Sequence, residues 1–282
     1  MMLLSWKPAR AVLLAMALFF GGIPLSSQSP RPAKELERFV PRMHDAKGQI
    51  DHARRLKRKV YSQPKESRDF WRKLAVEAYQ AVRVFHAEDR KRSVEASFRA
   101  GELLRSGGLH ESALQEFTWA SRARLGAFST RAMLEIGHIH RRERAHRRAL
   151  DAYLDVAADA RADAPHRDDA WLWAGHIWRR DGRTDDARGA WRRVAERGQD
   201  PLDRIRAFDL LGELWLVQED IEAACGVLNE CLQALAEAAL EETRNGERVR
   251  NALLRMRLVE QLPRAIASRN ISSREAGTSR NP

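Results

Sequence analysis

Residues 137–142 (GHIHRR) and residues 175–180 (GHIWRR) are near copies of one another, 38 positions apart along the chain. Each copy belongs to a longer pattern in which an alanine follows a glycine after twelve positions. The four occurrences of this pattern are Gly101/Ala113, Gly137/Ala149, Gly175/Ala187 and Gly212/Ala224. A fixed period of 36 to 38 residues predicts a solenoid, because one helical hairpin alone cannot bury its apolar face.

Large side chains recur at a fixed distance from each glycine. Those sixteen positions after the four glycines are Phe117, Tyr153, Trp191 and Leu228. The small residues are expected to let two helices approach closely, while the large side chains fill the space between hairpins. No segment alternates between apolar and polar residues for any length, so the sequence predicts an all-α protein.

The spacing resembles the tetratricopeptide repeat (TPR), whose pattern runs aromatic, Leu-Gly, aromatic, Ala, Phe and a closing Pro. The clearest match is Trp171, Ala174-Gly175, Trp178, Ala187 and Trp191. The period is longer than the standard repeat of about 34 residues, and the closing proline is missing. The resemblance covers roughly residues 94–240. It implies a right-handed α-solenoid of TPR-like helical hairpins with capping helices.

The first 29 residues have the composition of a targeting segment. Lys7 and Arg10 precede an apolar stretch at 11–20. Ten apolar residues are far fewer than the roughly 20 that span a bilayer, so a cleaved signal peptide is favoured over an uncleaved membrane anchor. The expected location is therefore the periplasm or cell envelope, with anchoring by an uncleaved signal as the alternative.

The rest of the chain divides by its patterns. Residues 30–93 are expected to form basic N-terminal helices and a degenerate capping repeat, and residues 94–244 four TPR-like repeats. Their hairpins should lie at about 94–124, 130–160, 168–198 and 205–240. Residues 245–267 are expected to form a C-terminal capping helix with a kink at Pro263. The polar residues 268–282 are expected to form a disordered tail.

In TPR proteins the first helix of each hairpin lines the concave groove, and the resemblance implies the same surface here. Positions one and four after each glycine should then face inward. This set supplies the partner-binding residues that we predict, Arg105, His138, Arg141, His176 and Arg179. Arginine grips carboxylate or phosphate through two N–H groups at once, so such a groove would favour an acidic peptide or an anionic polymer. The expected partner is a protein or peptide, with an acidic one as a possibility. Alternatively, these arginines are solvated and pair with nearby acidic side chains.

Catalytic and cofactor motifs are missing from the sequence. It has no glycine-rich phosphate loop, no serine nucleophile elbow and no metalloprotease helix, so we expect neither enzyme activity nor a cofactor. The cysteines and histidines lack the helical spacing of metal ligands, and no metal is expected. The net charge of +11 comes from arginines dispersed among acids, a poor argument for nucleic acid.

The primary hypothesis is therefore an exported, non-catalytic scaffold that holds a partner protein or peptide in its groove. The alternative is binding to an envelope polymer or an anionic membrane surface through the basic run at residues 54–59. A third possibility is self-association, in which the apolar end of the helical stack pairs with another copy.

Overall fold

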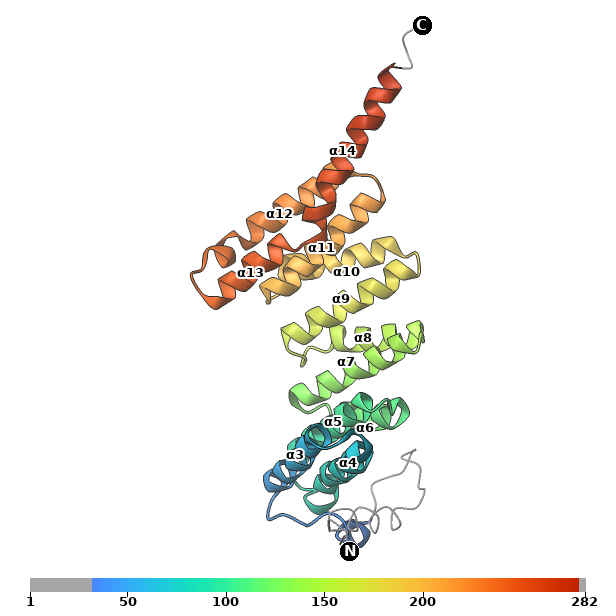
Figure 1. Cartoon of the computed structure of the whole chain (residues 1–282), viewed down its shortest axis with the longest axis vertical. Helices are drawn as coiled ribbons and strands as arrows, with labels where there is room; N and C mark the ends of the chain where they lie inside the picture. Colours follow the sequence, from blue (N-terminus) through green and yellow to red (C-terminus); the bar gives the residue numbers. More distant parts are fainter. Residues whose placement is uncertain (1–31, 279–282) are drawn as a thin grey trace, which may run out of the picture. The chain divides into compact units, whose positions relative to one another are not determined.

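The computed structural model describes residues 32–278 (Figure 1). The targeting segment expected at residues 1–29 lies outside this part of the chain. The described residues form helices and no strand, so the all-α prediction is confirmed. They divide into two compact units, one up to Glu116 and one from Phe117 onward.

The first unit consists of short helix α2, hairpin α3–α4, helix α5 and the first half of α6. Their bounds are α2 Ala33–Leu36, α3 Ala46–Ser62, the 3-10 turn η1 Lys65–Ser67, α4 Arg68–Phe85, α5 Arg90–Ser106 and α6 His110–Arg122. The carboxylates of Asp45 and Asp89 cap α3 and α5 by accepting backbone N–H groups. The hairpin α3–α4 occupies the place of the degenerate capping repeat.

The basic run at residues 54–59 lies on α3. The same helix buries Leu56 and Val60 against its unit. The Arg54 guanidinium pairs with Glu95 of α5 at 2.7 Å, and the Lys59 ammonium lies 4.3 Å from the centre of the Trp71 ring. Part of the basic run therefore has partners inside its own unit.

The second unit is a stack of helical hairpins followed by two further helices (Figure 1). The helices are α7 Gly126–Arg142, α8 His146–Ala158, α9 Ala164–Arg180, α10 Thr184–Arg197, α11 Pro201–Val217, α12 Ile221–Leu240, α13 Arg244–Leu254 and α14 Arg257–Thr278. The pairs α7–α8, α9–α10 and α11–α12 occupy the stretches in which the period predicts hairpins. None of the described helices combines the length and hydrophobicity needed to cross a bilayer.

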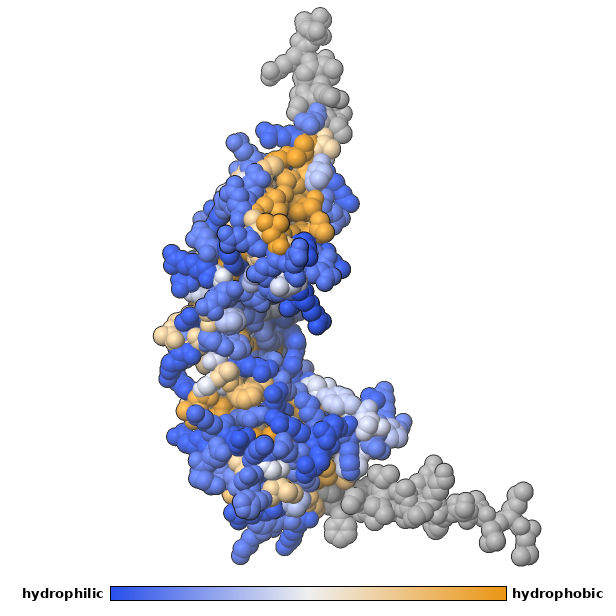
Figure 2. Space-filling view, turned by 90° about the vertical axis from the view of Figure 1, so that its left-hand side faces the viewer, coloured by the Kyte–Doolittle hydropathy of each residue, from blue (hydrophilic) through white to orange (hydrophobic). Residues whose placement is uncertain are grey.

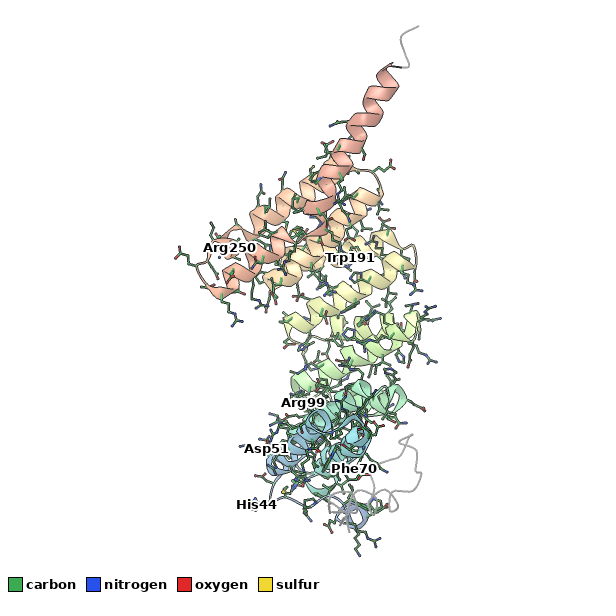
Figure 3. All side chains as sticks on the ribbon, viewed as in Figure 1. His44, Asp51, Phe70, Arg99, Trp191 and Arg250 are labelled. Carbon is green, nitrogen blue, oxygen red and sulfur yellow. The ribbon has the colours of Figure 1, made fainter. Side chains whose placement is uncertain are left out.

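The repeated glycines mark where the two helices of one hairpin touch. A Cβ atom built on Gly137 would lie 2.6 Å from the Tyr153 ring, and one built on Gly175 would overlap the Trp191 ring. Trp191, labelled in Figure 3, is fully buried, and its indole N–H donates to the carbonyl of Leu172 at 3.1 Å. The large rings thus pack within a hairpin, against its own glycine.

The last hairpin is packed differently. The side chain that fills the space beside Gly212 is Leu258 of α14, whereas Leu228 of α12 is only half-buried. The Leu258 amide also donates to the carboxylate of Asp209 on α11 at 2.9 Å. The C-terminal segment therefore enters the packing of the last hairpin and completes its core.

Two expectations for the C-terminus are wrong. The single capping helix expected at 245–267 is two helices, which meet between Leu254 and Arg257. Pro263 lies inside α14 without ending it. The helix also continues to Thr278, where a disordered tail was expected from residue 268. Residues 264–276 contain neither glycine nor proline, so nothing in the local sequence stops the helix.

Candidate functional site: an aromatic and arginine cluster on the second unit

The candidate site lies on the first helices of successive hairpins in the second unit. Helix α9 packs against both α7 and α11, so side chains from all three can meet. We call the following residues the Trp173 cluster: His138 and Arg141 of α7, Tyr153 of α8, Asp169, Trp173, His176 and Arg179 of α9, and Arg206 and Glu213 of α11.

The half-buried indole of Trp173 is the centre of this cluster. The guanidinium carbon of Arg141 lies 4.2 Å from the ring centre, and that of Arg206 lies 5.2 Å from it. The rings of His138 and His176 approach the indole at centroid distances of 5.4 and 5.3 Å. Each cation–π contact contributes about 0.5–2 kcal/mol, depending on how far it is withdrawn from water. Trp173 therefore holds side chains of α7 and α11 in place.

His138 is fixed by two further contacts. Its Nδ1 lies 2.7 Å from the Tyr153 hydroxyl, and its Nε2 lies 4.0 Å from the Asp169 carboxylate. Burial raises the pKa of Tyr153, so its hydroxyl stays protonated. The imidazole orientation is thus set by α8 on one side and α9 on the other.

Arg179 has a different environment from Arg141. Its guanidinium pairs with Glu213 at 3.1 Å, and the second oxygen of that carboxylate receives Arg257 at the same distance. Two arginines share one largely buried carboxylate, so Arg179 belongs to an ion-pair network that links α9, α11 and α14. The alternative in which the predicted arginines pair with nearby acids describes Arg179 well.

The structure brings His138, Arg141, His176 and Arg179 together on one surface. Arg105 lies on α5, in the first unit, whereas the other four residues belong to the second unit. Its predicted place as an extension of the set stays a prediction.

Three residues of the cluster were missed by the sequence analysis, namely Asp169, Trp173 and Arg206. They lie two or six positions before the repeated glycines, at spacings of three and seven residues from the positions one after each glycine. Such spacings put side chains on one helical face. Following the helical face of the chosen residues toward the N-terminus of each helix would have identified these three residues.

Acidic side chains offset much of the positive charge on this surface. Burial raises the pKa of Asp169. It also raises the pKa of Asp203 on α11 to about 6, with a further contribution from the neighbouring carboxylates of Asp200, Asp169 and Asp168. Asp203 therefore carries charge at neutral pH and loses it on mild acidification. The surface is therefore a pattern of alternating charges rather than a purely basic groove.

His176 predicts a measurable pH dependence of stability. Burial, then the charges of Arg206 and Arg179, lowers the pKa of His176 to about 4. The unfolded chain takes up this proton near pH 6.5, so His176 contributes stability above pH 6.5 that is lost as the pH falls toward 4. We expect the NMR signals of the His176 ring to remain unchanged down to about pH 5.

The variant His176→Gln isolates this contribution. Asp203 acts in the opposite direction between about pH 4 and 6, because its raised pKa favours folding at lower pH. The difference in free energy of unfolding between wild type and variant removes the Asp203 effect. That difference should change steadily between pH 6.5 and 4, and a constant difference would contradict the low pKa of His176.

Among the described residues, no group of three or more histidine, cysteine, aspartate or glutamate side chains is arranged to hold a metal ion. The cluster instead offers aromatic edges, guanidinium N–H groups and two imidazoles. These groups suit recognition of a polar or anionic segment of another molecule.

No protein-family model and no curated protein matches the sequence. The chain is similar to the crystal structure of MamA at 18% identity and a TM-score of 0.46, covering 63% of this chain and 96% of that one. It is also similar to a kinesin light chain from Podosopora anserina with nearly identical TPR-like repeats, at 13% identity and a TM-score of 0.47, covering 71% and 100% of the two chains. BtubC (BKLC) from P. vanneervenii aligns at 15% identity and a TM-score of 0.42, covering 71% and 94%. The all-α solenoid of TPR-like hairpins is established by the helices and glycine contacts described above.

Proposed function

We propose that the protein is a non-catalytic scaffold that binds an acidic segment of a partner protein on the Trp173 cluster. Helical-repeat proteins use the extended surface formed by successive hairpins to bind their partners. The observation that carries the proposal is the contact of one half-buried indole with guanidinium groups from the two neighbouring helices, α7 and α11.

Stacking on an indole prepares an arginine for binding. The guanidinium is planar, so its N–H groups point outward along the plane while its face rests on the ring. The guanidinium carbons of Arg141 and Arg206 both lie close to the Trp173 ring, and this contact reduces the conformational entropy that binding would remove from them. Each can then receive a carboxylate through two parallel hydrogen bonds.

The acids on the same surface narrow the class of partner. Asp169 and Asp203 lie among the charges of Arg206 and its neighbours, so a uniformly anionic polymer would meet repulsion as well as attraction. A polypeptide with acidic residues at particular positions can place them on the arginines and avoid the aspartates. This favours a protein segment over an envelope polymer as the ligand of the cluster.

The proposed site residues are Arg141, His138, Trp173 and Arg206, with His176 and Arg179 supporting them from α9. The proposal includes export to the periplasm or cell envelope, which rests on the composition of residues 1–29. An envelope surface bound through α3 remains the competing function.

The test is a crosslinking pull-down with the full chain from cells that naturally make it, followed by affinity measurement with the captured partner. We expect Trp173→Ala, and separately the pair Arg141→Glu and Arg206→Glu, to weaken binding by about 30-fold or more, as for other buried aromatic and arginine anchors. Circular dichroism and thermal unfolding would show that each variant is folded.

Arg188→Glu is the matched control. Arg188 also stacks on an indole, at 4.5 Å from the ring centre of Trp215, but it lies on α10, a second helix of a hairpin. Binding should be unchanged in this variant. Equal recovery of the partner by all variants would overturn the proposal. Loss of binding only on Arg55→Glu and Arg58→Glu in α3 would transfer the function to the basic N-terminal helix.

A further inference from the structure

An exposed apolar surface lies at the C-terminal end of the second unit. Figure 2 shows a broad hydrophobic area at the height of α12 and α14. We call the following residues the C-terminal apolar surface: Leu232 and Leu240 of α12, Leu254 of α13, and Val259 and Ile266 of α14. Most of the large apolar side chains exposed on the described part of the chain belong to this set. Apolar groups clustered in this way mark an interaction site.

The packing of the last hairpin explains why this surface is open. Helices α8 and α10 each pack against the first helix of the following hairpin, α9 and α11. Helix α12 packs instead against α13 and α14, which bury Cys231 and Leu235 but leave Leu232 47% exposed. Because Leu258 fills the space beside Gly212, Leu228 is also left at the edge of the core. An apolar stripe therefore continues along α12 beyond the side that α13 and α14 cover.

The charges on either side of this surface differ in sign. Every charged residue of α12 is a glutamate, namely Glu222, Glu230 and Glu237. The charged residues of α13, of the link to α14 and of α14 up to residue 270 are mostly arginines, namely Arg244, Arg248, Arg250, Arg255, Arg257, Arg264 and Arg269 against Glu247 and Glu260. Glu230 is paired with Arg192, Arg257 with Glu213 and Arg264 with Glu260. The exposed charges that an incoming molecule would meet therefore include Glu222 and Glu237 on the acidic side, and Arg244, Arg248 and Arg255 on the basic side.

A surface with an acidic half and a basic half is complementary to itself. Under a two-fold axis, the acidic helix of one copy faces the basic helices of the other, and the same contact is made twice. A foreign partner of a single charge sign would match only one of the halves. We infer that the C-terminal apolar surface is a dimer interface, in which α12 of one copy packs against α13 and α14 of a second copy.

Sedimentation velocity of the purified full chain over a concentration series tests this inference. We expect a dimer in the wild type and a monomer in Leu232→Glu, with the dissociation constant raised at least about tenfold. Tyr61→Glu is the matched control, because Tyr61 is a 61% exposed aromatic residue of the first unit. It should leave the dimer intact.

Leu254→Glu is a second variant, at a side chain that is 76% exposed and whose replacement should not disturb folding. A wild-type chain that stays monomeric up to about 100 μM overturns the inference, as does a dimer that survives both substitutions. Dissociation by Tyr61→Glu as well would place the interface elsewhere.

Mixed charge variants test the pairing of α12 with the basic helices. Glu237→Arg and Arg255→Glu should each weaken the dimer when alone in solution. Mixed in equal amounts, the two variants should form a heterodimer. In one of its two symmetric contacts the native pair Glu237 and Arg255 is kept, and in the other both charges are reversed, so opposite charges still face each other. A mixture no more associated than either variant alone would rule out this arrangement. Partner binding at the Trp173 cluster does not enter either measurement.

Discussion

Replacement of Trp191 by alanine is expected to lower the free energy of unfolding by about 3–5 kcal/mol. The Trp191 side chain is fully buried, its ring fills the space that Gly175 leaves open, and its indole N–H donates to the Leu172 carbonyl. Alanine would remove this apolar contact and leave a cavity between α9 and α10. Because α9 carries Trp173 and His176, partner binding should also weaken.

Chemical denaturation followed by circular dichroism measures the loss, with two controls. Trp191→Phe keeps an aromatic ring but not the hydrogen bond, so its effect should be smaller than that of alanine. Trp173→Ala removes a half-buried tryptophan from the same hairpin and should destabilise much less than Trp191→Ala. Equal losses at the two tryptophans would show that Trp191 does not occupy the interior of the hairpin.

Replacement of Leu258 by alanine is expected to cost about 2–5 kcal/mol, although this residue lies outside the recognisable repeats. Leu258 is fully buried against Gly212, and its amide is held by Asp209. Its removal opens a cavity in the last hairpin, because Leu228 does not fill that space. Denaturant unfolding should show the loss as a lower transition midpoint.

A double-mutant cycle of Gly212 and Leu258 tests directly whether these two residues are in contact. Gly212→Ala alone introduces a methyl group that overlaps Leu258 and should destabilise by about 1–3 kcal/mol. In the Leu258→Ala background the same methyl group enters the cavity, so the two losses should not add, with a coupling energy of about 0.5–3 kcal/mol. Gly226→Ala on α12 meets open space and should be neutral or stabilising. Additive losses would mean that Gly212 and Leu258 do not touch.

The fold class was predictable because it depends on a repeated local pattern. The recurrence of a glycine and an alanine twelve positions apart predicts helical hairpins. This prediction does not depend on which helix the large side chains, sixteen positions after each glycine, pack against. The contact between Gly175 and Trp191 within one hairpin was less accessible, since the period alone does not distinguish it from packing between hairpins. It depends on the distance and rotation between two helices.

The C-terminus shows where a pattern of fixed period stops being informative. Leu228 lies sixteen positions after Gly212, as Tyr153 and Trp191 lie sixteen positions after their glycines. The side chain that packs against Gly212, however, is that of Leu258. No periodic signal links Leu258 to α11, because the contact is made once, by a segment that is not a repeat. The break between α13 and α14 follows from this docking, and neither a proline nor a glycine announces it.

The candidate site was predicted in part. Inward positions that were taken from the TPR resemblance led to His138, Arg141, His176 and Arg179, which meet in one cluster. The centre of the cluster, Trp173, was missed because its counterparts in the other repeats are Arg99, Glu135 and Leu210, so no repetition marks it. The pairing of Arg179 with Glu213 depends on how one hairpin sits on the next.

The position of Leu258 also sets an order in which the chain can finish folding as it is synthesised. The hairpin α9–α10 holds both Gly175 and Trp191, and it is complete as soon as α10 has been made. The hairpin α11–α12 must wait, with the space beside Gly212 unfilled, until the ribosome has added α13 and the start of α14. The interior of this last repeat therefore stays open to water until a later segment, which is not itself a repeat, has been made.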